Sequence, residues 1–230
     1  MSIALVLSGP DHCSLFAKTV LADAANLAGC WTTTTGSSGA ATVEPEATMD
    51  IKSLQMDFRG EILTPGSAEY EVSRRIWNAM IDRRPAAIAR CNGPADVLAA
   101  IRFAVDQSIY PAIRAGGHNV AGLAMVDDGL VVDLTRMKGI YVDPDARTAT
   151  AQTGLTWGEF DRETQLYGLA TTGGLISTTG IAGLTLGGGI GWLLGRCGLA
   201  CDNTLSYDVV VANGKLIRAS ASEHPDLFWP

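Results

Sequence analysis

The densest group of residues that could do chemistry is the stretch from Arg114 to Asn119, which reads Arg-Ala-Gly-Gly-His-Asn. Two consecutive glycines allow backbone dihedrals that a side chain forbids, and they bring bare N–H groups close to an anionic partner such as a phosphate. Arg114 adds a fixed positive fork, and His118 adds a nucleophilic, metal-capable imidazole. A Gly-Gly-His triplet by itself is more often an ordinary turn with a surface histidine, so its weight depends on the sequence that follows.

A second glycine-rich segment runs from Thr172 to Gly191. It contains no G-x-x-x-x-G-K-[ST] phosphate loop and no G-x-G-x-x-G between an early strand and a helix, which excludes a P-loop and a Rossmann-type site. Close packing of backbones is the alternative use for such glycines. Two separate glycine cradles, one of them beside His and Arg, exceed what packing needs and favour a ligand site.

Composition limits the partners. The chain of 230 residues has a net charge of −7, which argues against nucleic acid and anionic membrane surfaces because such binding needs clustered Lys and Arg. Its apolar runs are shorter than a membrane span, and its first ten residues lack the positive flank of a secretory signal, so we expect a cytoplasmic location. The five cysteines are irregularly spaced. Cys197 and Cys201 could share a helical face, but they lack a matching ligand pair nearby, so no metal site is expected.

The elements that must position the Gly-Gly-His loop read as strand, helix, strand. Residues 86–91 are typical of a short buried strand, and Asn92-Gly93-Pro94 opens a helix with apolar residues at helical spacing. Residues 111–114 return as a strand that leads directly into the loop, and residues 130–134 form a further buried strand. The loop therefore follows the carboxyl end of a strand, where α/β folds usually place ligands.

A helix is also predicted ahead of this unit. It begins after Pro65-Gly66 with Ser67 as its cap, and it ends before Pro85. Its expected apolar face consists of Ile76, Trp77, Met80 and Ile81.

The second half of the chain has an antiparallel pattern. Residues 139–142 and 148–152 flank a turn sequence and are expected to pair as a hairpin. Thr156 and Glu159 form a capping box for a helix that continues to Tyr167. A second hairpin, residues 207–212 with 215–219, turns at Asn213-Gly214 and should lie at or near a sheet edge. The fold class is therefore α+β, with a small strand–helix–strand part followed by a mixed or antiparallel part.

The domain organisation follows from these patterns. Residues 1–50 are expected to be a disordered or loosely ordered extension, because Thr32 to Gly39 is low-complexity polar sequence, and Met49 could be the functional start. Residues 1–48 should then be dispensable for stability. Residues 51–80 form a lead-in helix region, and residues 81–230 form the main domain. That domain divides into an α/β subdomain, 84–134, and an antiparallel α+β subdomain, 135–230.

Four ordered segments resemble one family. Residues 114–119, 177–191, 198–203 and 224–229 together look like the FAD-linked oxidases that include berberine bridge enzyme and hydroxynicotine oxidase. The flavin domain of that family is the type named after p-cresol methylhydroxylase and vanillyl-alcohol oxidase. The resemblance covers roughly residues 59–229, and four motifs in the family's order make it more specific than any single match.

The resemblance implies FAD as the cofactor, held by a single covalent bond through His118. It also implies that the two glycine segments hold the pyrophosphate and flank the flavin, in agreement with the anion cradle inferred above. The cofactor-binding residues that it implies are Arg114, Ala115, Gly116, Gly117, His118, Asn119, Gly122, Gly174, Ser177, Thr178, Gly180, Ile181, Gly183, Leu184, Gly187, Gly188, Asp202 and Val209.

The chain departs from the family pattern at two points. Members with a second flavin bond use a cysteine where alignment through Gly180 and Gly187 places Ile176, so no second bond is expected. Family members also continue past the Asp-Leu-Phe-Trp motif into a further strand and a substrate domain, whereas this sequence ends at Pro230. We therefore expect the flavin domain to be incomplete at its C-terminus. The residues that select or activate a substrate are expected in the missing part.

Three functions remain open from the sequence. The leading one is the flavin part of an oxidase that takes a hydride from a C–H of a small-molecule alcohol, amine or sugar and passes the electrons to dioxygen. The second is a truncated FAD-binding fragment without catalytic activity. The third is an α+β protein without flavin, in which the glycines are purely structural.

Overall fold

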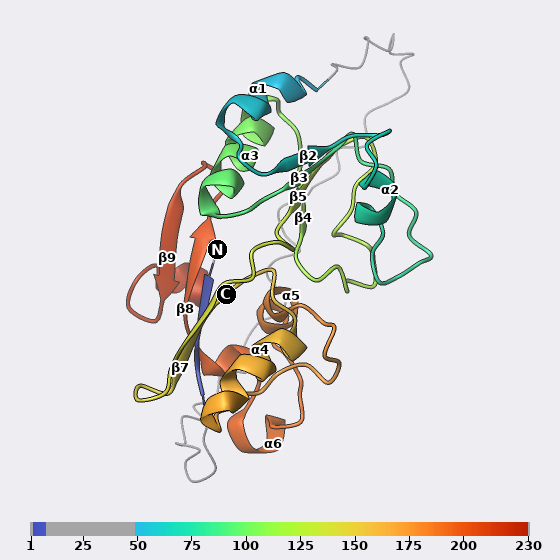
Figure 1. The fold of residues 1–230 in the computed structure, drawn as a ribbon. Helices are drawn as coiled ribbons and strands as arrows, with labels where there is room; N and C mark the ends of the chain where they lie inside the picture. Colours follow the sequence, from blue (N-terminus) through green and yellow to red (C-terminus); the bar gives the residue numbers. More distant parts are fainter. Residues whose placement is uncertain (1, 8–48, 230) are drawn as a thin grey trace, which may run out of the picture.

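The computed structural model describes residues 2–7 and 49–229, and within them two sheets form the framework (Figure 1). One sheet has four strands in the order β2-β3-β5-β4, and the other has five in the order β6-β7-β1-β8-β9. The α+β class expected from the sequence is confirmed.

The four-stranded sheet contains the predicted strand–helix–strand unit. Strand β3 (Ala87–Arg90) leads into helix α3 (Pro94–Asp106), and β4 (Ala112–Arg114) and β3 both run parallel to β5 (Leu130–Asp133). Strand β2 (Glu61–Leu63) pairs antiparallel with β3. The expected subdomain boundary at residue 84 is therefore wrong, because an edge strand from the lead-in region completes this sheet.

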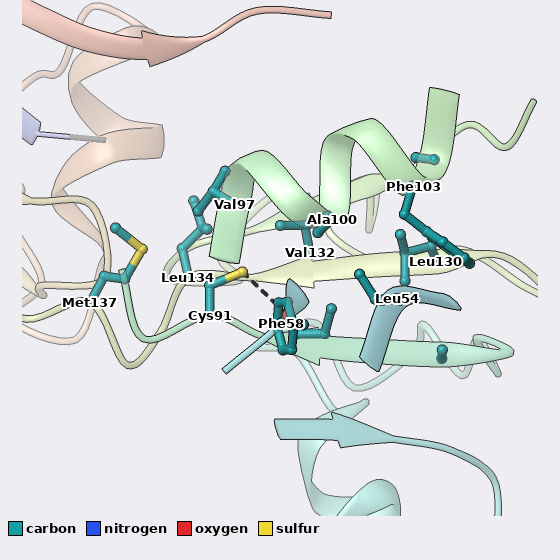
Figure 2. Close-up of a cluster of buried hydrophobic side chains, with 13 residues drawn as sticks. Leu54, Phe58, Cys91, Val97, Ala100, Phe103, Leu130, Val132, Leu134 and Met137 are labelled. Carbon is teal, nitrogen blue, oxygen red and sulfur yellow. Dashed lines mark hydrogen bonds between the residues drawn. The ribbon is translucent and has the colours of Figure 1, made fainter. Parts of the chain in front are cut away.

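The core of this half lies between the sheet and two helices, α3 and α1 (Ile51–Asp57) (Figure 2). Helix α3 contributes Val97, Ala100 and Phe103 at helical spacing, and they pack against apolar strand residues such as Val132. Beside them lies Cys91, whose thiol donates to the carbonyl of Ala89 at 3.6 Å, and burial raises the pKa of Cys91 far above its usual range. Such a thiol is a packed core group rather than a nucleophile.

The long helix expected between residues 67 and 84 is wrong. Helix α2 spans only Tyr70–Ser73. The chain after it is held by side-chain ion pairs and by hydrogen bonds to the loop that follows β4. Arg74 is buried, forms ion pairs with Glu71 and Asp82, and donates to the carbonyl of Arg83 at 3.2 Å.

Two further contacts fix this segment against the loop that follows β4. The backbone N–H of Trp77 donates to the Gly117 carbonyl at 3.2 Å, and the side-chain amide of Asn78 donates to the Val120 carbonyl at 2.8 Å. These tertiary hydrogen bonds replace the i to i−4 ladder that a helix would need. The apolar spacing of Trp77 and Met80 does not mark a buried face, since both side chains are largely exposed.

The five-stranded sheet is antiparallel throughout, as expected for this half. Strands β6 (Ile140–Asp143) and β7 (Thr148–Gln152) form the first predicted hairpin. Strands β8 (Thr204–Val210) and β9 (Leu216–Ser220) form the second, in which β8 begins three residues earlier than the sequence suggested. Strand β9 lies at the edge of the sheet, in agreement with the prediction.

The central strand of this sheet comes from the other end of the chain. Strand β1 (Ser2–Val6) pairs antiparallel with both β7 and β8. The expectation of a loose, dispensable extension is therefore wrong for residues 2–6, because this short apolar run completes a backbone ladder and buries Ile3 and Leu5 against α4 residues such as Trp157. Residues 8–48, with the low-complexity run, lie outside the described part of the chain.

Several short helices lie below the four-stranded sheet in the view of Figure 1. Helix α4 (Trp157–Thr164) begins with the predicted capping box of Thr156 and Glu159, continues as a 3₁₀ turn to Tyr167, and ends at Gly168 with φ of +66°. The remaining helical segments are α5 (Ile181–Leu186), α6 (Leu194–Cys197), a 3₁₀ turn (Cys201–Asn203) and α7 (Pro225–Phe228).

One expectation about these segments needs correction. Cys197 ends α6 and Cys201 begins a separate 3₁₀ turn, so the two cysteines do not share one helical face. Phe228 in α7 is 8% exposed and lies against Tyr207, with ring centroids 5.7 Å apart, so it is covered within the chain. Leu227 and Trp229 are the apolar residues of this motif that remain exposed.

The place of β1 generates a stability prediction. Leu5 has no exposed surface, so Leu5→Ala should lower the free energy of unfolding by about 2–5 kcal/mol. The control is Leu216→Ala on the edge strand β9, where the side chain is 47% exposed and the loss should be below about 1 kcal/mol. Urea unfolding followed by tryptophan fluorescence measures both. Equal losses in the two variants would show that β1 does not stabilise the sheet.

Candidate functional site

A cavity of about 470 Å³ lies between the Gly-Gly-His loop and the second glycine segment. The first wall comes directly after β4, and the second runs into α5. The lining residues are Ile113, Ala115, Gly116, Gly117, His118, Asn119, Leu123, Ala124, Leu134, Thr153, Thr179, Gly180, Ala182, Gly183, Leu184 and Leu186.

The two glycine segments meet backbone to backbone at Gly116 and Gly180. A Cβ atom on Gly116 would lie 2.5 Å from the Gly180 nitrogen, and one on Gly180 would lie 2.7 Å from the Gly116 Cα. Neither side chain could be accommodated without moving the backbone. Gly117 has φ of +69°, a conformation that favours glycine. The sequence pattern of two cradles therefore corresponds to one site in space.

His118 is half-buried on the cavity wall, and its ring is stacked on Trp77. The ring centroids are 5.6 Å apart with an interplanar angle of 20°. The backbone N–H of Trp77 donates a hydrogen bond to the Gly117 carbonyl, which holds the Trp77 backbone beside the loop that carries His118. The sequence placed Trp77 on a helix face, so this supporting contact was missed; only the tertiary fold brings the two rings together.

Arg114 does not line the cavity. Its guanidinium donates to the carbonyl of Ser73 and lies 3.8 Å from the carboxylate of Asp133, which is 2% exposed on β5. Burial lowers the pKa of Arg114, and the nearby Asp133 opposes that effect. The Arg114 side chain thus connects the start of the loop to Ser73 at the end of α2 and to Asp133 on β5. Its direct role as an anion ligand stays a prediction.

The structure brings together about half of the residues predicted for the site. Those that line the cavity are Ala115, Gly116, Gly117, His118, Asn119, Gly180, Gly183 and Leu184. Those that do not line it are Arg114, Gly122, Gly174, Ser177, Thr178, Ile181, Gly187, Gly188, Asp202 and Val209. Ile181 belongs to the core, and Asp202 accepts a hydrogen bond from the Leu199 N–H at 2.8 Å, so both act in the supporting structure.

The other lining residues were missed because most are small or apolar. Ile113 lies in β4 and Leu134 directly follows β5, so the rule that ligands lie at carboxyl ends of strands could have found them. Thr153 follows β7 and reaches the cavity through the tertiary fold, which no local pattern signals.

The chemistry of the lining suits an anionic ligand. None of the described lining residues is Asp or Glu, although the whole chain has a net charge of −7. His118 is the one lining residue with an ionisable side chain. Within residues 2–7 and 49–229, no cluster of three His, Cys, Asp or Glu could hold a metal ion. Across the same residues, no helix combines the length and apolar character needed to cross a membrane.

A second cavity of about 360 Å³ adjoins the first, because Ile113 and Leu134 line both. Its other walls are apolar residues of α3 and the segment that follows it, together with Val210 and Ala212 near the end of β8. The predicted site residue Val209 is the neighbour of Val210 on this strand.

The fold is α+β, and a cavity lies between its two glycine segments. A family model described as "FAD binding domain" matches residues 85–220. The chain therefore belongs to the FAD binding domain family, and its fold is the flavin domain of the p-cresol methylhydroxylase type. The expected family is confirmed, FAD binding is supported by the family match, and the reading without flavin is wrong.

Characterised and uncharacterised oxidoreductases are among the relatives. The chain is 36% identical over 174 residues to (R)-6-hydroxynicotine oxidase of Paenarthrobacter nicotinovorans, a match of 76% of this chain and 38% of the relative. It is 38% identical over 174 residues to the FAD-linked oxidoreductase YgaK of Bacillus subtilis, a match of 74% and 39% of the two chains.

Solved structures of FAD-linked oxidases have a similar fold over the matched part. 6-Hydroxy-D-nicotine oxidase from Arthrobacter nicotinovorans superposes with a TM-score of 0.73 at 37% identity, over 75% of this chain and 38% of that one. Xylooligosaccharide oxidase from Myceliophthora thermophila gives a TM-score of 0.72 at 32% identity, over 80% and 39%. The chain thus spans about two fifths of the length of the relatives that it matches.

The glycine contact generates a binding prediction. Gly116→Ala should weaken FAD binding at least about tenfold, because the added methyl group pushes the two walls of the cavity apart. Gly195→Ala in α6 is the control, since a Cβ atom there meets nothing within 4 Å and FAD affinity should be unchanged. Titration of flavin fluorescence measures both. Unaltered affinity in Gly116→Ala would mean that FAD does not bind between these loops.

Proposed function

We propose that this chain is the flavin-binding part of an FAD-dependent oxidase. The reaction would take a hydride from a C–H of a small-molecule alcohol, amine or sugar, with dioxygen as the final electron acceptor. The observation that carries the proposal is the cavity between two glycine segments with His118 on its wall. The relatives named above include a hydroxynicotine oxidase and a xylooligosaccharide oxidase, so they share the oxidase reaction rather than a substrate.

The residues present fit FAD in two respects. The backbone of Gly116 and Gly117 offers N–H groups without side chains in the way, and the described lining holds no carboxylate that would repel a pyrophosphate. When bound, FAD would supply the two-electron redox chemistry, and the chain would supply position and exclusion of water.

His118 is proposed as the single covalent attachment point. Its position on the cavity wall supports this role, and the stacked Trp77 restricts rotation of the imidazole. Ile176 supports the absence of a second bond, because its exposed side chain is aliphatic and has no nucleophilic atom. The role of Trp77 would be to hold the ring in one orientation.

The second cavity is proposed to take the adenine end of the cofactor. It shares Ile113 and Leu134 with the first cavity, and its lining is apolar, as suits a flat aromatic base. Val210 brings the end of β8 to this cavity, which supports a place for the neighbouring Val209 at the adenine end.

A second candidate is an FAD-binding unit that catalyses no oxidation by itself. The chain matches about two fifths of the length of the relatives named above, and the family model that it matches describes FAD binding. Oxygen consumption with a panel of alcohols, amines and sugars separates the two. Turnover by the FAD-loaded chain supports the oxidase, and tight FAD binding without any turnover supports the binding unit.

The attachment has a direct test. After expression and purification, acid precipitation should leave the yellow flavin in the pellet of the wild-type protein, whereas His118→Ala should release all of it to the supernatant. His224→Ala is the matched control, because this exposed histidine lies outside the cavity lining and its pellet should stay yellow. A colourless wild-type pellet from flavin-loaded protein would rule out the covalent bond.

A further inference from the structure

Two successive β-turns form the part of the cavity wall that follows the Gly-Gly-His loop. In the first turn, the Gly122 N–H donates to the Asn119 carbonyl at 3.1 Å. In the second, the Met125 N–H donates to the Gly122 carbonyl at 3.1 Å. The central residues of the second turn, Leu123 and Ala124, line the cavity. The shape of this wall therefore depends on how firmly the second turn is held.

One side chain from outside the loop binds both ends of the second turn. The Arg83 guanidinium donates from Nη1 to the Met125 carbonyl at 2.6 Å and to the Gly122 carbonyl at 3.4 Å. Met125 is 1% exposed and belongs to the core, so the shorter bond joins the guanidinium to a fixed point. A charged donor forms a stronger hydrogen bond with a carbonyl than a neutral donor does. Arg83 thus bridges the two ends of the turn.

Arg83 differs from the arginines beside it. Arg74 and Arg84 both form ion pairs with Glu71. None of the ion pairs between described residues involves Arg83. Its side chain is half-buried, and its acceptors are the two backbone carbonyls of the turn. Arg83 also lies outside the cavity lining, so its effect on a ligand must pass through the turn.

The backbone on either side of Arg83 is fixed to the same loop by other contacts. Gly122 has φ of +71°, and a Cβ atom there would lie 2.7 Å from Cγ2 of Ile81. The backbone N–H of Arg84 donates to the carboxylate of Asp127 at 2.7 Å. These contacts do not involve the Arg83 guanidinium, so a change of that side chain should leave the segment in place.

We propose that Arg83 is a positioning residue of the cofactor site, which holds Leu123 and Ala124 in the arrangement that FAD contacts. The inference rests on the proposed placement of FAD in this cavity. A turn that is fixed before the ligand arrives does not have to be ordered on binding, and such ordering costs affinity. Without the guanidinium, the Met125 carbonyl loses its charged donor and the turn can open.

The inference predicts two linked effects in Arg83→Met, which removes the guanidinium and keeps an unbranched apolar side chain. In the protein without FAD, the amides of Gly122 and Met125 should exchange with deuterium at least about fivefold faster, because the turn opens more often. FAD affinity should fall about tenfold, because binding must then order the turn. A merely structural arginine would lower the melting temperature without a selective loss of protection in this turn.

The experiment uses the full chain in the His118→Ala background, in which FAD can dissociate. Hydrogen–deuterium exchange followed by mass spectrometry reports on the turn, and titration of flavin fluorescence gives Kd. Arg83→Lys restores a charged donor and should bind FAD within about threefold of the parent. Arg75→Met is the matched control, because it removes an exposed arginine outside the cavity lining and should change neither quantity.

Unchanged exchange in Arg83→Met would overturn the inference whether or not FAD binds, because the guanidinium would not hold the turn. Faster exchange with an unchanged Kd would overturn it as well, while FAD binding in the cavity stands. If neither the parent nor the wild-type protein binds FAD, the proposed placement of FAD fails and the positioning role with it. Should Arg83→Met fold poorly, Arg83→Gln, which also lacks the charge, replaces it, and parental exchange or Kd again overturns the role.

Discussion

The contact between Gly116 and Gly180 is the constraint on which the site depends. Each glycine occupies space that a Cβ atom on the other would need, so the loop after β4 and the segment before α5 can approach as closely as two backbones allow. The cavity exists beside this contact because the same loops supply its walls. A cofactor with a charged centre can then be held by backbone N–H groups, without a cluster of basic side chains.

The supporting groups around this contact are shared with the rest of the fold. Arg114 starts the loop and is tied to Ser73 and Asp133, while Trp77 bonds to Gly117 and stacks on His118. The segment of residues 74–84 is therefore part of the site, although it lines none of the cavity. The His118 imidazole stacks on a residue of a chain segment that precedes the whole strand–helix–strand unit.

The five-stranded sheet illustrates a different dependence. Within each of its two hairpins the paired strands are neighbours in the sequence. The hairpins themselves are joined by β1, which comes from residues 2–6. Loss of β1 would separate β7 from β8 and expose the apolar groups that Trp157 and its neighbours cover. The wall of the cavity formed by α5 packs on this same core through Ile181 and Ala182, so the site depends indirectly on the strand.

The sequence by itself determined the elements whose signals are local. Turn residues, the capping box at Thr156 and the helical spacing after Pro94 gave both hairpins and helices α3 and α4, because each depends on residues a few positions apart. The motif around His118 and the second glycine segment likewise gave the cofactor class. The tertiary structure decided the features that depend on distant contacts. These are the central position of β1 in a sheet, the end of α2 at Ser73, and the place of Thr153 in the cavity lining. These features come from hydrogen bonds and packing between residues far apart in the chain, for which a local pattern of hydrophobicity or propensity carries no signal.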